Sequence, residues 1–382
     1  MKILIAISDS FCANFIKGQG GYLVGQNHQV VVVSGEGPEI DNLEIAEPVK
    51  VVRIPFSREI SPINDLRDLI RIIILVRREK PDLINAGNPK TGFLFSLAHI
   101  FFWKIPLVFT LRGLRSDTLT GLKKYVVKLT EKITCALANK VIAISPSLKE
   151  HAIQNHIVSR KKCLVLSKGS SNGIDINHYK TSDDIKIKSD EIIKKYGIAI
   201  DSFKLVFVGR VTKDKGIIEL LEAFKYCLSA NANLRLIIAG PIEMQDPIPD
   251  EYYKLIEEHP KIHYIGKQID VRPVYELGDA LVLYSHREGF GNVVIEASNM
   301  GLPTIVADIP GLKDTTEDEF TGLLVKPKDA LELGKAIMRL YSDRNLARSY
   351  GNNGRRRVSE YFSNTIIWEK QLQLYTQLNS SI

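Results

Sequence analysis

The sequence has no apolar run long enough to span a membrane. A spanning helix needs about 18 to 20 apolar residues in succession. The closest stretch, residues 91–109, is interrupted by His99, Lys104 and Pro106. The apolar run that opens the chain is too short for a signal peptide and is better explained by a buried first strand. We therefore expect a cytoplasmic protein.

Motifs for metal sites, disulfide frameworks and serine hydrolases are also missing. The chain has four cysteines, and none of them forms a C-x-x-C pair, which argues against both zinc and disulfides. The eight histidines include no H-E-x-x-H pattern, and no G-x-S-x-G occurs. A metal held by the protein is therefore not expected.

The dinucleotide-binding fingerprint G-x-G-x-x-G is incomplete. Gly18 and Gly20 follow the first expected strand, but they come late, and Leu23 stands where the third glycine belongs. Nicotinamide binding is therefore disfavoured. We expect the segment 8–23 to be a loop that faces a ligand cleft, with Asn14 and Lys17 as candidate contacts.

Positive charge is present in excess and is unevenly distributed. The 382 residues have a net charge of +7, and the excess of Lys and Arg over Asp and Glu falls within residues 1–180. A basic first half suits nucleic acid, an anionic membrane surface or an anionic substrate.

Short apolar strands alternate with helices twice along the chain. This pattern indicates an α/β protein of two doubly wound, Rossmann-like domains with parallel sheets. A polar stretch after residue 160 favours a boundary, and we expect domains at 1–170 and 171–364, with the last helix, about 365–382, packing back on the first. Ligands of such sheets bind beyond the carboxyl ends of the strands, so a cleft between the domains is the expected site.

The loop GRVTKDKG, residues 209–216, is a candidate anion site between an expected strand and an expected helix. Gly209 permits a close turn, and Arg210 and Lys215 add two cations to the positive end of the helix. This combination suits a diphosphate. A solvated basic loop is the alternative.

Two acids flank a glycine-rich bend in HREGFGNVVIEASNMGLPT, residues 286–304. The glycines place Glu288 in a loop, Asn292 can cap the next helix, and Glu296 lies about one turn into it. Carboxylates at these positions would accept hydrogen bonds from hydroxyls, as acids do for a ribose. An ordinary helix start, where the dipole favours acids, is the alternative.

Polar residues in the first half are further candidates for ligand contacts. Arg112 and Arg115 follow the carboxyl end of an expected strand, where they would either meet an anion or form a surface pair. Asn172 and Gly173 suit a tight turn near the domain junction, and a plain turn is the alternative to a cleft contact.

The helix expected over residues 121–140 has two stripes at helical spacing. Lys124, Lys128 and Lys132 form a basic stripe. The adjacent apolar stripe consists of Tyr125, Leu129, Ile133 and Leu137. A packed helix with a solvated face explains this pattern, and a surface that rests on anionic lipid is the alternative.

Together these motifs resemble the family 4 retaining glycosyltransferases of the GT-B fold. The second half carries FVGRVTKDKG, AGP, HREGFGNVVIEASNMGLPTIVADIPG and TGLLVKP; the first carries NPKTGFL, TLRGLRSDT, ISPSLKE and GSSNGID. The first-half motifs are similar to a subgroup that adds N-acetylhexosamine-type sugars to polyprenyl-diphosphate-linked saccharides in bacterial capsule, O-antigen or N-glycan assembly. The resemblance implies an acceptor-side first domain and a second domain that binds a nucleotide sugar across a cleft.

The resemblance also implies roles for individual residues. Arg210 and Lys215 would bind the donor diphosphate, Glu288 the donor sugar and Glu296 the ribose, with the first three as the catalytic residues. Further donor contacts are implied at Gly209, Phe290, Gly291, Asn292 and Val293, and the base would lie near residues 265–268. Neither a metal nor a cofactor is implied.

One position departs from the family pattern. Many members have a histidine where this chain has Arg112, so that histidine's sugar contact is not carried over. Arg112 would instead contact a phosphate or the acceptor.

The expected function is that of a retaining hexosyltransferase at the inner face of the plasma membrane. It would move a sugar from a UDP-sugar, such as UDP-N-acetylhexosamine, to a lipid-linked saccharide, with no nucleic acid as partner. A GT-B nucleotide-sugar epimerase and a non-catalytic nucleotide-sugar-binding protein are the alternatives. Both acids and both cations are present, which favours an enzyme, and the basic first half favours an extended anionic acceptor.

Overall fold

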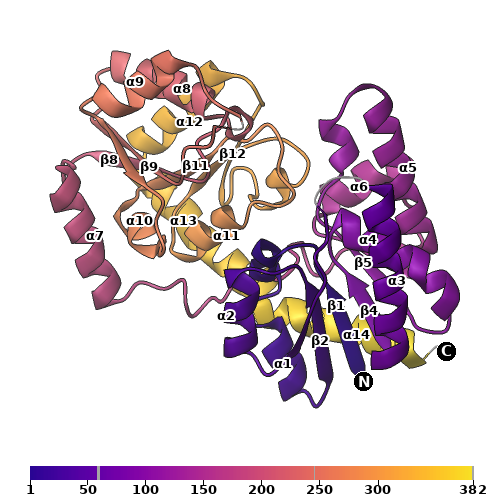
Figure 1. Cartoon of the computed structure of the whole chain (residues 1–382). Coiled ribbons are helices and arrows are strands. Elements are labelled where there is room, and N and C mark those ends of the chain that lie inside the picture. Colours follow the sequence, from indigo (N-terminus) through magenta and orange to yellow (C-terminus); the bar gives the residue numbers. More distant parts are fainter. Residues whose placement is uncertain (58–60, 245, 381–382) are drawn as a thin grey trace. The chain divides into compact units, whose positions relative to one another are not determined.

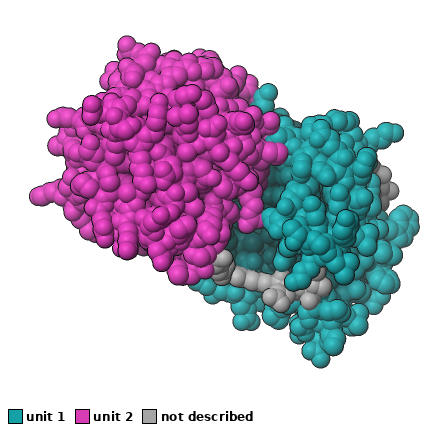
Figure 2. Space-filling view, turned by 90° about the horizontal axis from the view of Figure 1, so that it is seen from above, with its two compact units in different colours: residues 1–173, 364–382 teal, residues 174–363 magenta. Residues whose placement is uncertain are grey.

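The computed structural model describes residues 1–57, 61–244 and 246–380, which form two compact units (Figures 1 and 2). Unit 1 comprises Met1–Gly173 and the C-terminal segment from Asn364, and unit 2 comprises Ile174–Ser363. The expected boundary after residue 170 lies three residues before this division. Residues 381–382 of the expected last helix lie outside the described residues.

Unit 1 is built on a seven-stranded parallel sheet in the order β3-β2-β1-β4-β5-β6-β7. The central strands are almost entirely buried, as expected for parallel strands covered by helices on both faces. The strands are β1 (Lys2–Ala6), β2 (Gln29–Ser34), β3 (Lys50–Arg53), β4 (Leu83–Ala86), β5 (Leu107–Leu111), β6 (Lys140–Ala143) and β7 (Cys163–Leu164).

The helices of unit 1 follow its strands in alternation. They are α1 (Gln19–Gly25), α2 (Pro38–Ala46), α3 (Pro62–Glu79), α4 (Pro89–His99), α5 (Gly121–Leu137), α6 (Pro146–Gln154) and α14 (Asn364–Ser380), with short 3-10 turns η1 (Ser10–Phe15), η2 (Ile100–Phe102) and η3 (Arg115–Thr118). The prediction of a loop over residues 8–23 is wrong, because η1 and the start of α1 occupy most of it. Ser145 caps α6, since its Oγ accepts a hydrogen bond from the Leu148 amide.

Unit 2 repeats this architecture with a six-stranded parallel sheet in the order β10-β9-β8-β11-β12-β13. The two sheets confirm the prediction of two Rossmann-like α/β domains. The strands are β8 (Phe203–Val208), β9 (Leu234–Ala239), β10 (Ile262–Gly266), β11 (Ala280–Leu283), β12 (Thr304–Ala307) and β13 (Gly322–Val325). The helices are α7 (Asp183–Tyr196), α8 (Ile217–Ser229), α9 (Asp250–Glu258), α10 (Arg272–Leu277), α11 (Asn292–Asn299), α12 (Ala330–Ser342) and α13 (Arg344–Tyr361), with 3-10 turns η4 (Lys213–Lys215) and η5 (Leu312–Asp314).

The C-terminal helix α14 belongs to unit 1 and is fixed there by buried polar contacts. The Trp368 indole donates a 2.7 Å hydrogen bond to Asn172 Oδ1, and its ring lies 5.4 Å from the ring of Tyr22 on α1. Asn85 Nδ2 donates to the Tyr375 hydroxyl at 2.6 Å. Both ends of the chain therefore build one unit (Figure 1).

Candidate functional site

The order of the second sheet brings two loops together. Strands β8 and β11 are neighbours, although two strands and three helices separate them along the chain. The succession of strands reverses direction at this point, and such a switch point opens a crevice at the carboxyl ends of the strands. The loop 209–216 leaves β8 there and the loop 284–291 leaves β11 there, so the two strongest sequence motifs meet.

The contact between these loops is an ion pair. Lys215 Nζ lies 2.5 Å from Glu288 Oε2, and the two side chains are only 14% and 20% exposed. Lys215 ends the η4 turn, and Gly216 follows it in the left-handed conformation as N-cap of α8. A Cβ on Gly216 would lie 2.0 Å from the Tyr284 carbonyl oxygen. Glycine at this position therefore lets the lysine loop pack against the end of β11.

Further charged side chains surround this pair. Arg210 Nη1 donates to Glu243 Oε2 at 2.8 Å, and its Nη2 lies 3.7 Å from Asp214 Oδ2. Arg287 Nη2 lies 3.4 Å from the same Asp214 oxygen. Cations and carboxylates thus alternate around the two loops. A bound dianion would compete with the carboxylates for the guanidinium and ammonium groups.

Three charged residues near this site were not predicted from the sequence: Asp214, Glu243 and Arg287. Asp214 and Arg287 stand beside predicted residues in TKDKG and HREGF, so their position was a usable signal. Glu243 lies in the segment that follows β9, and its contact with Arg210 depends on the β8–β9 pairing, which no local pattern reveals.

The bend before α11 differs from its prediction in one respect. Asn292 does not cap the helix but is its first residue, and the N-cap is Gly291 with φ of +83°. A Cβ on Gly291 would also lie 2.9 Å from Leu312 Cδ1. Gly291 therefore satisfies both the backbone and the available space, and the N–H groups at the start of α11 remain suited to an anion.

Of the donor contacts predicted around this bend, Phe290 and Val293 have side chains that pack into the protein. The Phe290 side chain is buried and its ring lies 5.5 Å from that of Phe362, so only its backbone could meet a ligand. Val293 is half-buried and packs against the core of unit 2. Gly209 leaves the end of β8, and its carbonyl oxygen lies so close to Gly240 that a Cβ there would be only 1.8 Å away.

Glu296 lies on α11 but is engaged by tyrosines. The Tyr275 hydroxyl donates to Glu296 Oε2 at 2.9 Å. Burial raises the pKa of Glu296, although hydrogen bonds from Tyr275 and Tyr179 oppose this shift. The two tyrosines hold the carboxyl group in one orientation, as a specific hydroxyl contact requires.

The expected base-binding segment, residues 265–268, comprises the last two residues of β10 and the two that follow, at the edge of the same sheet. Gln268 Nε2 donates to the Ile265 carbonyl at 2.6 Å, and the Tyr264 hydroxyl donates to the Gly240 carbonyl at 3.0 Å. The segment is therefore folded back on itself and fixed to the loop after β9. Its role in base recognition stays a prediction.

The candidate residues of unit 1 do not form one cluster. Asn14 is exposed and bonds to the Phe11 carbonyl, while the Lys17 carbonyl accepts a hydrogen bond from Asn172 Nδ2 at 2.9 Å. Both polar ends of Asn172 are thus used within unit 1. Arg115 is exposed in η3.

Arg112 follows β5, which lies beside β4 and one strand away from the switch point between β1 and β4. Its guanidinium donates to the Gly87 carbonyl at the end of β4, lies 5.5 Å from the Phe15 ring, and leaves Nε buried without a partner among the described residues. Burial lowers the pKa of Arg112 to about 10. A half-buried cation lies at the carboxyl edge of the sheet, and its contact with a phosphate or an acceptor stays a prediction.

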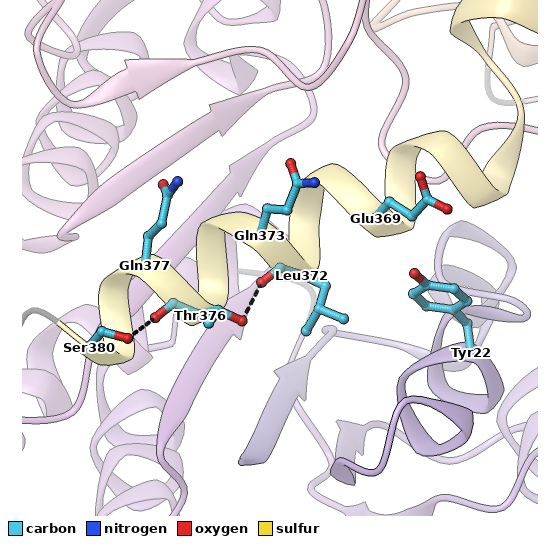
Figure 3. A pocket seen from close by; sticks show the side chains of 7 residues that line it. All are labelled: Tyr22, Glu369, Leu372, Gln373, Thr376, Gln377 and Ser380. Atoms are coloured by element: carbon cyan, nitrogen blue, oxygen red, sulfur yellow. Dashed lines mark hydrogen bonds between the residues drawn. The ribbon is translucent and has the colours of Figure 1, made fainter.

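An open groove of about 690 Å³ lies elsewhere, between α1 and α14 (Figure 3). Tyr22 projects from α1 toward Glu369 and Leu372 of α14, and Gln373, Thr376, Gln377 and Ser380 complete the lining. These residues belong to unit 1 and include none of the predicted donor contacts in unit 2. The groove carries no catalytic pair and is not the candidate site.

The residues that the structure describes offer no group of three or more His, Cys, Asp or Glu side chains placed to hold a metal ion. The four cysteines are free and buried.

Two family models together match most of the chain. Residues 188–357 match the model described as "Glycosyl transferases group 1", and residues 13–177 match "Glycosyltransferase Family 4". The Staphylococcus aureus capsular polysaccharide biosynthesis glycosyltransferase CapM is 35% identical over 98% of this chain and 96% of its own length. The Escherichia coli UDP-Gal:alpha-D-GlcNAc-diphosphoundecaprenol alpha-1,3-galactosyltransferase is 26% identical over 82% of this chain and 80% of its own.

Solved structures share the whole fold. A glycosyltransferase from Rickettsia africae matches with a TM-score of 0.82 at 20% identity, covering 99% of this chain and 98% of its own. Anabaena HepE, solved in complex with UDP, matches with a TM-score of 0.80 at 20% identity over 99% of this chain and all of its own.

Proposed function

The chain belongs to the family 4 glycosyltransferases of the GT-B fold, and from this premise we propose that it is a retaining hexosyltransferase that uses a UDP-sugar. The acceptor is a hydroxyl group of a lipid-linked saccharide in bacterial surface polysaccharide synthesis. The enzyme works at the inner face of the plasma membrane and needs neither metal nor cofactor.

The observation that carries this proposal is the Lys215–Glu288 pair at the switch point of the second sheet. A nucleotide sugar is a dianion between two polyols. Lys215 and Arg210 offer cations for the diphosphate, Glu288 offers a carboxylate for sugar hydroxyls, and Glu296 offers one for the ribose. All four side chains come from the β8 and β11 loops or from α11, so one crevice would bind the whole donor.

Support for the donor and acceptor classes comes from relatives. The name of the E. coli relative states UDP-Gal as donor and a diphosphoundecaprenol-linked GlcNAc as acceptor. A Campylobacter jejuni relative, 25% identical over 87% of this chain, is named as an N-acetylgalactosaminyltransferase acting on a diphospho-undecaprenol-linked sugar. The capsule role of the S. aureus relative fits the same class of acceptor.

The proposed mechanism is front-face displacement with retention. The acceptor hydroxyl forms its bond to C1 on the face from which the diphosphate leaves, and a departing phosphate oxygen takes the hydroxyl proton. Lys215, Arg210 and the N-terminal N–H groups of α11 stabilise the negative charge that develops on the diphosphate. Glu288 fixes the sugar through its hydroxyls and orients the Lys215 ammonium.

Transfer from UDP-N-acetylhexosamines to lipid-linked acceptors extracted from bacteria tests the proposal. Lys215→Ala and Glu288→Gln should each lower turnover about 100-fold or more, the usual effect of removing one preorganised electrostatic contact. Lys225→Ala is a matched control, because Lys225 pairs with Glu222 on the exposed face of α8. Wild-type turnover in both site variants would rule out the assignment.

The same assay separates the alternatives. A new nucleotide sugar formed from the donor without an acceptor would indicate an epimerase. Tight donor binding without transfer to any extract would indicate a binding protein. Undiminished transfer with EDTA and an anomeric configuration equal to that of the donor are the results expected here.

A further inference from the structure

Helix α5 buries Val127 and Cys135 but also exposes several large apolar side chains. Its buried positions include Glu131 and Thr134, with Glu131 accepting hydrogen bonds from the Ser116 amide at 3.1 Å and from the Ser116 hydroxyl at 2.6 Å. Next to the exposed Lys123 and Lys124, exposed apolar side chains recur along it at i, i+3, i+4 and i+7, which places them on one face of the helix. These are Leu122 (79% exposed), Tyr125 (73%), Val126 (43%) and Leu129 (58%). The expected apolar stripe is thus only partly packed, because Tyr125 and Leu129 point outward.

Helix α3 shows a second outward apolar stripe. Ile72, Leu75 and Val76 pack into unit 1, as the core-facing side of the helix should. On another face, exposed apolar residues recur with spacings of three or four positions. They are Ile63, Leu66, Ile70 and Ile74, each at least 50% exposed. The helix is therefore apolar toward both the core and the solvent.

These two helices flank α4 in one layer of unit 1 (Figure 1). Helix α4 contacts both neighbours and is largely buried. At its C-terminal end, Ile100, Phe101 and Trp103 are 56%, 63% and 70% exposed. More than half of the large apolar side chains exposed among the described residues lie on α3, on α5 or in this short segment. We call these exposed side chains the α3–α5 face.

The exposed charges carried by α3 and α5 themselves have one sign, whereas Asp117 of η3, which packs against α5, is an exposed carboxylate. Within the described helices α3 and α5, all four carboxylates are withdrawn from solvent: Asp65 bonds to Lys90, Asp68 to Arg71, Glu79 to Lys2 and Lys50, and Glu131 to Ser116. The solvent-facing charges that remain are positive: Arg67, Arg71, Arg77, Arg78, Lys123, Lys124, Lys128 and Lys132.

Exposed apolar side chains on helices whose own exposed charges are all positive are complementary to an anionic lipid surface. Leucine, isoleucine and phenylalanine insert below the headgroups, lysine and arginine pair with lipid phosphates, and Trp103 and Tyr125 suit the interface between water and hydrocarbon. Among the described residues no helix is long and apolar enough to cross a bilayer. A partner of this chemistry would therefore be met at its surface.

We propose that the α3–α5 face is the membrane-docking surface of the protein, with the apolar side chains of α3, α5 and the Ile100–Trp103 segment inserted among anionic lipids. This inference rests on the proposed function, which requires access to a lipid-linked acceptor. It assigns the task to unit 1, whereas the donor residues belong to unit 2.

Flotation of the full chain with lipid vesicles tests this surface. The protein should float with vesicles of phosphatidylglycerol and phosphatidylcholine, and it should float much less with phosphatidylcholine alone or at high salt. The pair of substitutions Leu122→Ser and Tyr125→Ser should lower the vesicle partition coefficient at least about tenfold. Ile70→Ser with Ile74→Ser should act similarly, and Lys124→Gln or Lys128→Gln should each cost about fivefold.

Matched controls come from exposed apolar residues on other helices. Ile187 on α7 and Leu331 on α12 are 59% and 49% exposed, and serine at either position should leave flotation unchanged. Vesicle binding that is unchanged by the α3 and α5 substitutions would overturn the proposal. So would a dimer in ultracentrifugation that these substitutions dissociate, because the face would then belong to a second copy. UDP binding, measured separately, reports on unit 2, so failure of the donor site would not be mistaken for failure of docking.

Discussion

The ammonium nitrogen of Lys215 lies 2.5 Å from a carboxylate oxygen of Glu288, although 73 positions separate the two residues in the chain. An ammonium group has three N–H donors, so Lys215 can keep this contact and still bind phosphate oxygens. Glu288 therefore has two tasks in the proposed site, to orient the cation and to hold the donor sugar.

If Glu288 has both tasks, its substitution should lower the rate of sugar transfer without weakening the binding of UDP. Glu288→Gln removes a negative charge near the diphosphate, so UDP affinity measured by calorimetry should stay equal or rise a few-fold. Lys215→Ala should weaken UDP binding at least about tenfold, because a charge-assisted contact is lost. Equal losses of UDP affinity in both variants would mean that Glu288 acts only by holding Lys215 in place.

Replacing the glycines of the two loops by alanine should destabilise the protein to different extents. Alanine at Gly216 would combine left-handed backbone, which costs about 1–2 kcal/mol, with a Cβ 2.0 Å from the Tyr284 carbonyl oxygen. Alanine at Gly291 would have the same left-handed backbone cost, but its Cβ would meet side-chain atoms alone, Leu312 Cδ1 at 2.9 Å and atoms of Glu288 and Leu283 at 3.4 Å. Urea unfolding should therefore show the larger destabilisation for Gly216→Ala. Gly25→Ala, which meets nothing within 4 Å, should be neutral or slightly stabilising.

The ion pairs of Glu79 should make the free energy of unfolding depend on pH in the acid range. Hydrogen bonds from Lys50 and Lys2 hold the pKa of its carboxylate at about 2, against an ordinary value of 4.5. The stabilising contribution is complete above about pH 4.5 and is lost as the pH falls toward 2, and it amounts to roughly 1–3 kcal/mol. Glu79→Gln should thus lower the free energy of unfolding at pH 7 but much less near pH 3. Glu150→Gln, in an exposed pair with Arg160, should show a smaller pH dependence. A parallel offset at both pH values for Glu79→Gln would contradict this account.

Substitution of Asn172 tests whether this residue stabilises unit 1 or contacts a ligand. Its side chain donates a hydrogen bond to the Lys17 carbonyl and accepts one from the Trp368 indole. Asn172→Ala should therefore lower the free energy of unfolding of unit 1 by about 1–3 kcal/mol, with a lower melting temperature. Trp368→Phe removes one of these hydrogen bonds and should cost less than the loss of both. Unchanged melting combined with lost transfer would instead identify Asn172 as a cleft residue.

Much of the fold was predictable because parallel strands that are buried on both faces leave continuous apolar runs, as in the QVVVVS segment of β2. The η1 turn and α1 were missed because a short 3-10 turn and a seven-residue, glycine-rich helix leave little periodic signal. Asn292 was misplaced by one position because a left-handed glycine can take over the N-cap.

The candidate site was predictable only in its parts. Local sequence placed Lys215 and Glu288 on separate loops, but their contact depends on β8 lying beside β11, which is a property of sheet order. Likewise, the two stripes of α5 were visible in the sequence, but the buried contact of Glu131 with Ser116 was not, because it depends on η3 packing against α5.

The return of α14 to unit 1 sets an order for folding during synthesis. Unit 2 is one continuous segment, so it can fold as soon as Ser363 has left the ribosome. Unit 1 lacks Trp368 and Tyr375 until α14 emerges behind unit 2, so Asn85 and Asn172 have no buried partners while all of unit 2 is being translated. Unit 1 therefore begins before unit 2 but is completed after it, and a nascent chain that stalls within unit 2 would expose an unfinished unit 1 to chaperones and proteases.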